Sequence, residues 1–282
     1  MSRFMRSSTA FALAGLLAAA SVNVDAQERQ TCDRDYKPEV GQSGKDVVWV
    51  PTPDEVVQRM LNMAKVTPQD VVYDLGAGDG KIAIAAGKIG ATSVGIEYNP
   101  EMAKLAQCYV QAEKLAGKTR IIQGDVFKED FSKATVVTMY LLPQLNLRLR
   151  PTILDMRPGT RVTSHQFTMG DWEPDETAEF DHRRAYLWIV PAKVEGTWTL
   201  REQGGTGTQY MVNLKQQYQK VSGDAAKQPL VGATVRGEEL RFAFNDDNGV
   251  TRTLTGTVRG SELTGTLRGV GGAEVKVTGK RE

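Results

Sequence analysis

Hydrophobic and polar positions along the chain follow two different patterns, which meet near Pro191. From about residue 47 to 191, short apolar runs typical of buried strands alternate with stretches in which apolar residues recur at helical spacing. The predicted strands lie at 71–75, 92–97, 119–123, 134–140, 159–165 and 185–191, and the predicted helices at 80–90, 100–116 and 145–156, with a further helix starting near Asp54. Such alternation predicts a doubly wound, Rossmann-like α/β domain over residues 47–192, built on a parallel sheet covered on both faces.

After Pro191 the helical spacing stops, and glycine and threonine become frequent. Short segments rich in β-branched or aromatic residues are separated by turn signals such as Asp247-Asn248-Gly249. These segments are Thr197–Arg201, Tyr210–Lys215, Leu240–Phe244, Thr251–Val258, Glu262–Leu267 and Glu274–Thr278. They predict a separate antiparallel all-β domain over residues 193–282, either a small barrel or a sandwich.

The first 26 residues have the pattern of a signal peptide. Arg3 and Arg6 precede an apolar run from Phe11 to Val22, and a small residue, Ala26, ends a cleavage-like site. The alternative is a permanent membrane anchor, but the apolar run is shorter than the roughly 20 residues of a spanning helix. We therefore predict an exported, periplasmic protein. Residues 27–46 are polar and aperiodic, which predicts a flexible lead-in.

The charge balance bears on the partner. The chain has 35 basic and 34 acidic residues, and cleavage after Ala26 would leave 33 of each, since Arg3, Arg6 and Asp25 are lost. Nucleic-acid binding depends on clustered lysine and arginine that neutralise phosphates. A neutral mature chain argues against a nucleic-acid partner.

The cysteines and histidines indicate neither a metal site nor a particular reaction. In an exported chain Cys32 and Cys108 could pair, and their separation does not decide the matter. The interpretation that we favour from sequence is two unpaired thiols, one near the mature N-terminus and one in a helix. His165 and His182 have no second candidate ligand at metal-binding spacing, so no metal is predicted.

A glycine-rich loop is the strongest chemical signal. The apolar strand 71–75 runs directly into Gly76-Ala77-Gly78-Asp79-Gly80. This strand-to-helix turn lies at the carboxyl edge of a parallel sheet, where glycines let the backbone approach a ligand, so a nucleotide-like cofactor is expected. Lys81 stands where a dinucleotide fingerprint needs its third glycine, and Ile82 stands where a phosphate-binding P-loop needs Ser or Thr. Dehydrogenase and ATPase chemistry are therefore disfavoured.

Two acids follow this loop at the ends of the next strands. Glu97, about twenty residues on, can accept hydrogen bonds from both ribose hydroxyls of an adenosine group. Asp125 can accept from an adenine amine, while Val126 packs on the ring. Together with the loop, in this order and spacing, they predict S-adenosyl-L-methionine as the cofactor.

Several motifs resemble a known family. They are Trp49-Val50-Pro51-Thr52-Pro53, Val72–Lys81, Gly95-Ile96-Glu97, Thr138–Pro143 and Pro158–His165. Over roughly residues 47–175 the chain resembles the seven-strand, class I protein-lysine methyltransferases of mitochondria that modify the ATP synthase c subunit and the adenine nucleotide translocase, with their bacterial relatives.

The resemblance implies a role for particular residues. The cofactor-binding residues would be Asp74, Gly76, Gly78, Asp79, Glu97 and Asp125, to which the pattern of the loop and strand end adds Gly80 and Val126. Pro51, Thr52 and Tyr140 would line the methyl-transfer site, where a lysine of a protein substrate would be N-methylated.

Other functions stay open at this point. The acceptor could be a small molecule, or the β domain could make the chain an envelope interaction protein whose methyltransferase-like part is a non-catalytic scaffold. The loop Asp171-Trp172-Glu173-Pro174-Asp175 could face a basic substrate, but we favour a solvated loop with Trp172 packed beneath it.

Overall fold

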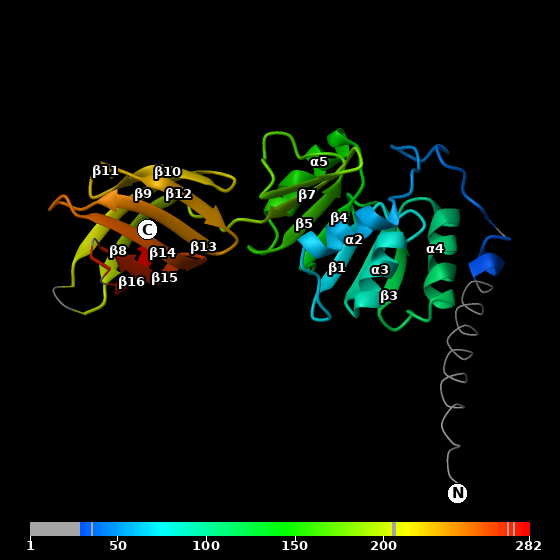
Figure 1. Cartoon of the computed structure of the whole chain (residues 1–282), viewed down its shortest axis with the longest axis horizontal. Coiled ribbons are helices and arrows are strands. Elements are labelled where there is room, and N and C mark those ends of the chain that lie inside the picture. The colour runs from blue at the N-terminus through cyan, green and yellow to red at the C-terminus, as the bar shows by residue number, and fades with distance from the viewer. Residues whose placement is uncertain (1–28, 35, 205–206, 270, 273) are drawn as a thin grey trace, which may run out of the picture. The chain divides into compact units, whose positions relative to one another are not determined.

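The computed structural model describes residues 29–282 except 35, 205, 206, 270 and 273 (Figure 1). The predicted signal peptide over residues 1–26 lies outside the described residues. No helix within the described ranges combines the length and apolar character needed to cross a membrane. The chain divides into two compact units, Met1–Leu142 and Pro143–Glu282. Each is described by itself.

Over residues 36–142 the first unit contains four parallel strands and three helices. The strands are β1 (Val71–Leu75), β2 (Thr92–Glu97), β3 (Thr119–Gln123) and β4 (Val136–Met139), and the helices are α2 (Asp54–Met63), α3 (Lys81–Ile89) and α4 (Pro100–Ala112). Both crossovers, through α3 and α4, step in the same direction from β1 to β2 to β3, so right-handed connections place both helices on one face. The strand order then reverses, since β4 pairs with the other side of β1. Ligands of open α/β sheets bind at the carboxyl ends of the strands at this switch point.

The second unit begins with the rest of this seven-stranded sheet. It contains α5 (Pro143–Leu154), β5 (Arg161–His165), β6 (Glu176–Phe180) and β7 (Arg183–Ile189), and the sheet order is β3-β2-β1-β4-β5-β7-β6. The prediction of a wholly parallel sheet is wrong at this edge, because β7 is antiparallel to both β5 and β6. The two-residue turn between β6 and β7 explains the hairpin, since Asp181 and His182 both have positive φ (45° and 58°), as a tight hairpin turn requires.

The remainder of the second unit is an antiparallel β-barrel. Its strands are β8 (Gly196–Glu202), β9 (Gln209–Gln217), β10 (Lys220–Ala225), β12 (Val231–Arg236), β13 (Glu239–Asn245), β14 (Thr251–Arg259), β15 (Glu262–Arg268) and β16 (Glu274–Arg281), with the short β11 (Gln228–Pro229) paired to β10. Pairing of β10 with both β9 and β12 and of β8 with both β9 and β16 closes these eight strands. The predicted antiparallel all-β fold of this region is confirmed, and of its two alternatives the barrel is correct.

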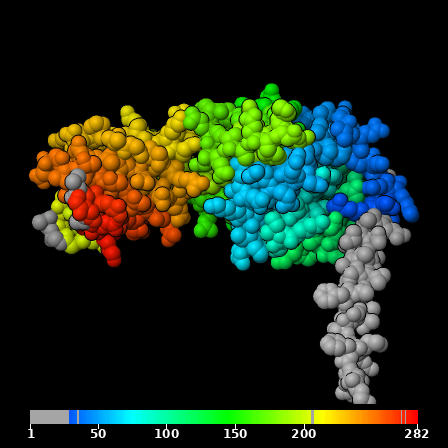
Figure 2. Space-filling view, in the orientation of Figure 1, coloured from blue at the N-terminus to red at the C-terminus, as the bar shows by residue number. Residues whose placement is uncertain are grey.

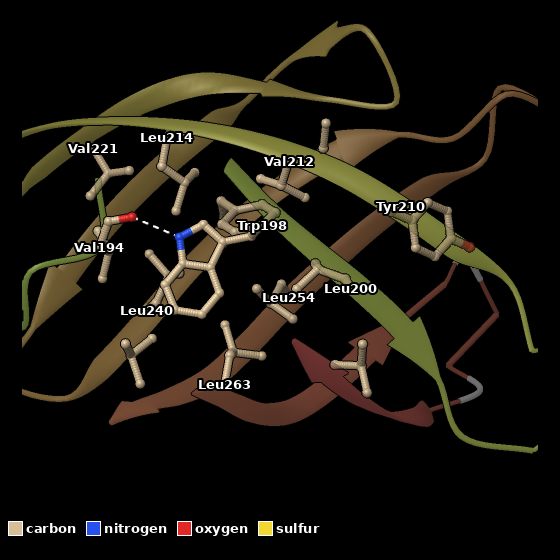
Figure 3. Close-up of a cluster of buried hydrophobic side chains, with 14 of the residues drawn as sticks. Val194, Trp198, Leu200, Tyr210, Val212, Leu214, Val221, Leu240, Leu254 and Leu263 are labelled. Carbon is tan, nitrogen blue, oxygen red and sulfur yellow. Dashed lines mark hydrogen bonds between the residues drawn. The ribbon is translucent and has the colours of Figure 1, made fainter. Parts of the chain in front are cut away.

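Large apolar side chains fill the barrel (Figure 3). Trp198, Phe242 and Phe244 are fully buried, and the Trp198 indole N–H donates to the Val194 carbonyl at 2.8 Å. Eight strands give an interior that is just wide enough for side chains. The barrel is therefore a packed core.

The loop around Trp172 belongs to this packing. Trp172 is fully buried and stacks on Tyr218 of the barrel, with ring centroids 6.0 Å apart. Asp171 accepts hydrogen bonds from Arg150 and Tyr218, and Lys220 pairs with Glu173 at 2.7 Å. Trp172 is packed beneath its loop, as we favoured, and the acids on either side are bonded within the second unit.

Candidate cofactor and methyl-transfer site

The glycine loop connects β1 to α3 in a conformation that favours glycine. Gly76, Gly78 and Gly80 have φ of 77°, 56° and 79°. A Cβ added at Gly78 would lie 2.7 Å from Nε1 of Trp49, so a larger residue would also clash there. Side chains also lie close to the other two glycines, with Leu141 beside Gly76 and Ala106 beside Gly80.

Asp74, at the end of β1, is the most constrained acid of the site. It is 2% exposed, and its Oδ1 accepts a hydrogen bond from the Thr138 hydroxyl of β4 at 2.7 Å. Its Oδ2 is buried and has no hydrogen-bond partner among the described residues. Burial, together with the nearby charges of Asp79 and Glu97, raises the pKa of Asp74 to about 7, although the Thr138 hydrogen bond opposes this. A buried, unpaired carboxylate oxygen calls for a cationic donor.

Glu97, at the end of β2, is held by backbone donors on both sides. Its Oε2 accepts from Gly78 N–H and its Oε1 from Asn99 N–H, each at 2.8 Å. Asn99 in turn caps α4, because its side chain accepts from two N–H groups of the first turn. The Glu97 carboxylate is therefore oriented against the glycine loop, and its oxygens keep lone pairs for further donors.

Asp125 follows β3 at the same edge. Its Oδ1 accepts from Phe127 N–H and its Oδ2 from the Lys45 ammonium, both at 3.0 Å. These two hydrogen bonds, the backbone one first, lower the pKa of Asp125, so this carboxylate is ionised at neutral pH. Val126 beside it is partly buried.

Asp79 lies within the loop itself. Its Oδ1 accepts from Lys81 N–H at 3.3 Å, and burial raises its pKa. The structure thus places the predicted cofactor residues Asp74, Asp79 and Glu97 around one loop, with Asp125 at the neighbouring strand end.

The predicted methyl-transfer residues lie near the switch point. Tyr140 directly follows β4, whose last residue, Met139, is paired with Leu75 of β1. Thr52 is buried and Pro51 partly buried, just before α2. Their roles stay predictions.

Sequence reasoning missed Lys45, at the end of the lead-in, and Trp49, which follows it closely. Lys45 bonds Asp125, and Trp49 lies against Gly78. The sequence offered one signal, since Trp49 begins the Trp-Val-Pro-Thr-Pro motif. Thr138, which holds Asp74, could have been found from its position in the strand before Tyr140.

The interpretation of the cysteines as unpaired thiols is wrong. Cys32 and Cys108 form a disulfide between the lead-in and α4, across 76 residues. Cys32 lies in an apolar cluster with Met102 and Leu105 of α4, against which Tyr36 also packs. This packing brings the two sulfur atoms together.

Both histidines lie in the second unit. His165 ends β5 in the second unit, where burial, assisted by Arg183, lowers its pKa to about 4. His182 is in the β6–β7 turn. The described residues contain no group of three or more His, Cys, Asp or Glu arranged to hold a metal.

Comparisons with known proteins find methyltransferases. The ANTKMT methyltransferase domain family model matches residues 74–176. A protein-lysine N-methyltransferase of Saccharolobus islandicus (strain REY15A) is 41% identical over 151 residues, which cover 51% of this chain and 94% of that protein. The human lysine N-methyltransferase for the c subunit of ATP synthase is 30% identical over 45% of this chain and 54% of its own length.

A solved structure is also similar. The RNA methyltransferase from Salinibacter ruber in complex with S-adenosyl-L-homocysteine is 46% identical, covers 51% of this chain and 96% of its own, and has a TM-score of 0.51. S-adenosyl-L-methionine fits the residues of the present site, because its ammonium group can meet the unpaired Asp74 oxygen and its ribose hydroxyls the remaining lone pairs of Glu97. The chain therefore belongs to the class I S-adenosyl-L-methionine-dependent methyltransferases, in the family of the archaeal protein-lysine N-methyltransferase.

Proposed function

We propose that the protein is an exported protein-lysine N-methyltransferase. The observation that carries this proposal is the 41% identity to a protein-lysine N-methyltransferase along 94% of that enzyme. The carboxylates and glycines expected to bind the cofactor are all present. A degraded, non-catalytic scaffold would not need to keep them.

The residues of the chain have to bind and orient the cofactor and the lysine and to exclude water from both. S-adenosyl-L-methionine, when bound, supplies an activated sulfonium methyl group. Glu97 and Asp125 would hold the adenosine part and Asp74 the ammonium group. Tyr140, Thr52 and Pro51 would line the approach of the lysine, whose amine must be neutral to attack. A desolvated channel favours that state by lowering the lysine pKa, and alignment of the amine supplies much of the rate.

Export is the second part of the proposal. The basic and apolar N-terminus supports it, and so does the Cys32–Cys108 disulfide, because disulfides persist mainly in oxidising compartments. The alternative is an uncleaved N-terminal anchor. Mass spectrometry of the protein from a periplasmic fraction should give a chain that begins at Gln27. A chain that keeps residues 1–26 and stays with the membrane would contradict cleavage.

The acceptor can be tested with the mature chain, residues 27–282, and methyl-labelled S-adenosyl-L-methionine. A lysine-rich protein should be labelled, the same protein with acetylated lysines should not, and hydrolysis should release N-methyl-lysine. If a chain that binds the cofactor labels neither protein nor small amines, the non-catalytic interaction protein becomes the better account.

RNA is the second candidate acceptor, because the 46% identical Salinibacter ruber protein is an RNA methyltransferase. The balanced charge of the mature chain argues against it. Total RNA in the same assay distinguishes the two, and label in RNA but not in protein would overturn the lysine proposal.

A further inference from the structure

The lead-in and the residues that follow it as far as Val50 form a strap that is fastened to α4 at one end. We call residues 36–50 the strap. Just before it, the Cys32–Cys108 disulfide makes a covalent joint to α4. Two polar contacts reinforce the joint, since the Tyr109 hydroxyl donates to Asp33 and Arg29 pairs with Glu113 at 2.9 Å. The described part of the lead-in, dark blue in Figure 2, lies on the surface of the first unit.

The other end of the strap reaches the cofactor site at two places. Lys45 bonds Asp125 at 3.0 Å, and its ammonium lies 4.4 Å from the ring centroid of Tyr98, the residue after Glu97. Lys45 therefore bridges the loops that follow β2 and β3. Trp49 lies against the glycine loop, where its indole Nε1 is 2.7 Å from the position that a Gly78 Cβ would take.

Hydrogen bonds within the strap fix these two side chains relative to each other. Gly41 N–H donates to the Trp49 carbonyl at 2.8 Å, and Trp49 N–H donates to the Gln42 carbonyl at 2.9 Å. Lys45 lies in the turn between these paired segments. Trp49 also packs against the apolar cluster of Cys32, Met102 and Leu105. A continuous series of side-chain contacts thus links the disulfide, this apolar cluster and the glycine loop.

We propose that the strap is a wall of the cofactor pocket, in which Trp49 packs on bound S-adenosyl-L-methionine beside Gly78, Lys45 latches the strap to Asp125, and the Cys32–Cys108 disulfide is the positioning device. A bulky aromatic that is already held over the loop loses little further freedom when it binds a ligand. Without the disulfide the strap samples open positions. The apparent affinity is then the affinity of the closed form multiplied by the fraction of molecules in which the strap is closed.

Calorimetric titration of the oxidised mature chain with S-adenosyl-L-homocysteine tests this. Trp49→Ala should weaken binding about ten-fold or more, as expected from the loss of an aromatic packing partner. Cys32→Ser/Cys108→Ser should weaken it by a similar factor, and reduction of the wild type with a phosphine should give the same result. Lys45→Ala should weaken binding, whereas Lys37→Ala, which removes an exposed lysine of the same strap, should not.

Hydrogen exchange gives a readout that is independent of activity. Backbone amides of residues 41–49 should be protected when S-adenosyl-L-homocysteine is added to the oxidised protein, and less so in the serine variant. Affinity within two-fold of wild type in either Trp49→Ala or reduced wild type would overturn the proposal. Tighter binding by Lys45→Ala would also overturn it, because Lys45 would then compete with the adenine for Asp125. Asp74→Ala should abolish binding. If Asp74→Ala loses binding and Trp49→Ala binds as the wild type does, the cofactor site is supported and the role of the strap is refuted.

Discussion

Cofactor affinity should depend on pH through Asp74. Its pKa in the free protein is raised to about 7, mainly by burial, so at pH 5 the carboxyl is protonated and neutral. A protonated Asp74 cannot pair as an anion with the ammonium group of the cofactor. Binding therefore favours the ionised form and lowers this pKa in the complex. By linkage, affinity is fully present above pH 7 and is lost as the pH falls through that value.

The size of the effect follows from the pKa. At pH 5, two units below about 7, roughly one molecule in 100 has an ionised Asp74. If the pKa in the complex lies below 5, affinity falls up to about 100-fold, or about 2.7 kcal/mol at 1.36 kcal/mol per unit. Asp79 contributes in the same direction, because burial also raises its pKa.

Equilibrium dialysis with labelled S-adenosyl-L-homocysteine, between pH 5 and 7.5 at constant ionic strength, measures this directly. Asp74→Asn is the matched control, since it keeps the shape and the Thr138 contact but cannot ionise. Its affinity should be low throughout and change much less with pH. A flat profile for the wild type, or an equally steep one for Asp74→Asn, would refute the reasoning.

The remaining predictions concern single contacts. Glu97→Ala should weaken S-adenosyl-L-homocysteine binding by roughly 1.5–3 kcal/mol in calorimetry, because charge-assisted hydrogen bonds are lost, and unchanged affinity would remove Glu97 from the site. Tyr140→Phe should lower single-turnover methyl transfer more than it lowers affinity, and an unchanged turnover would leave the hydroxyl without a catalytic part. Cys32→Ser/Cys108→Ser should lower the free energy of unfolding by about 4 kcal/mol in denaturant titration, given a disulfide that spans 76 residues. Phe242→Ala, in the barrel core, should cost roughly 3–5 kcal/mol of stability and leave cofactor affinity unchanged, and a loss of affinity in the folded variant would contradict this.

Most of the seven-stranded sheet could be predicted because its strands are buried apolar runs. The predicted strands 71–75, 92–97 and 119–123 coincide with β1, β2 and β3. β6 was missed because Glu-Thr-Ala-Glu-Phe is largely polar and lies at the sheet edge, where solvent covers much of it. Only its hairpin with β7 makes it a strand.

In the barrel, strands with a clear apolar alternation were found and weaker ones were not. Phe242 and Phe244 mark β13 plainly, whereas β10 and β12 contain glycine and polar residues. Their backbone hydrogen bonds to neighbouring strands, which a sequence pattern does not record, hold them in the sheet.

In the candidate site, too, local features could be predicted from the sequence and long-range contacts could not. The glycine loop and Glu97 are local signals, since one strand-to-helix turn and one strand end define them. The contacts of Lys45 with Asp125 and of Cys32 with Cys108 join positions about 80 residues apart, and only the folded chain brings them together. Residues 27–46 were predicted to be a flexible lead-in, and the structure places Lys45 of this segment on Asp125.

Binding of S-adenosyl-L-methionine by the glycine loop and its carboxylates can be measured by calorimetric titration. The mature chain, residues 27–282, is titrated with S-adenosyl-L-homocysteine at pH 7.5, beside Asp74→Ala. We expect saturable binding of one ligand per chain that is lost in the variant. No heat of binding from a well-folded wild type, or equal binding by Asp74→Ala, would contradict it.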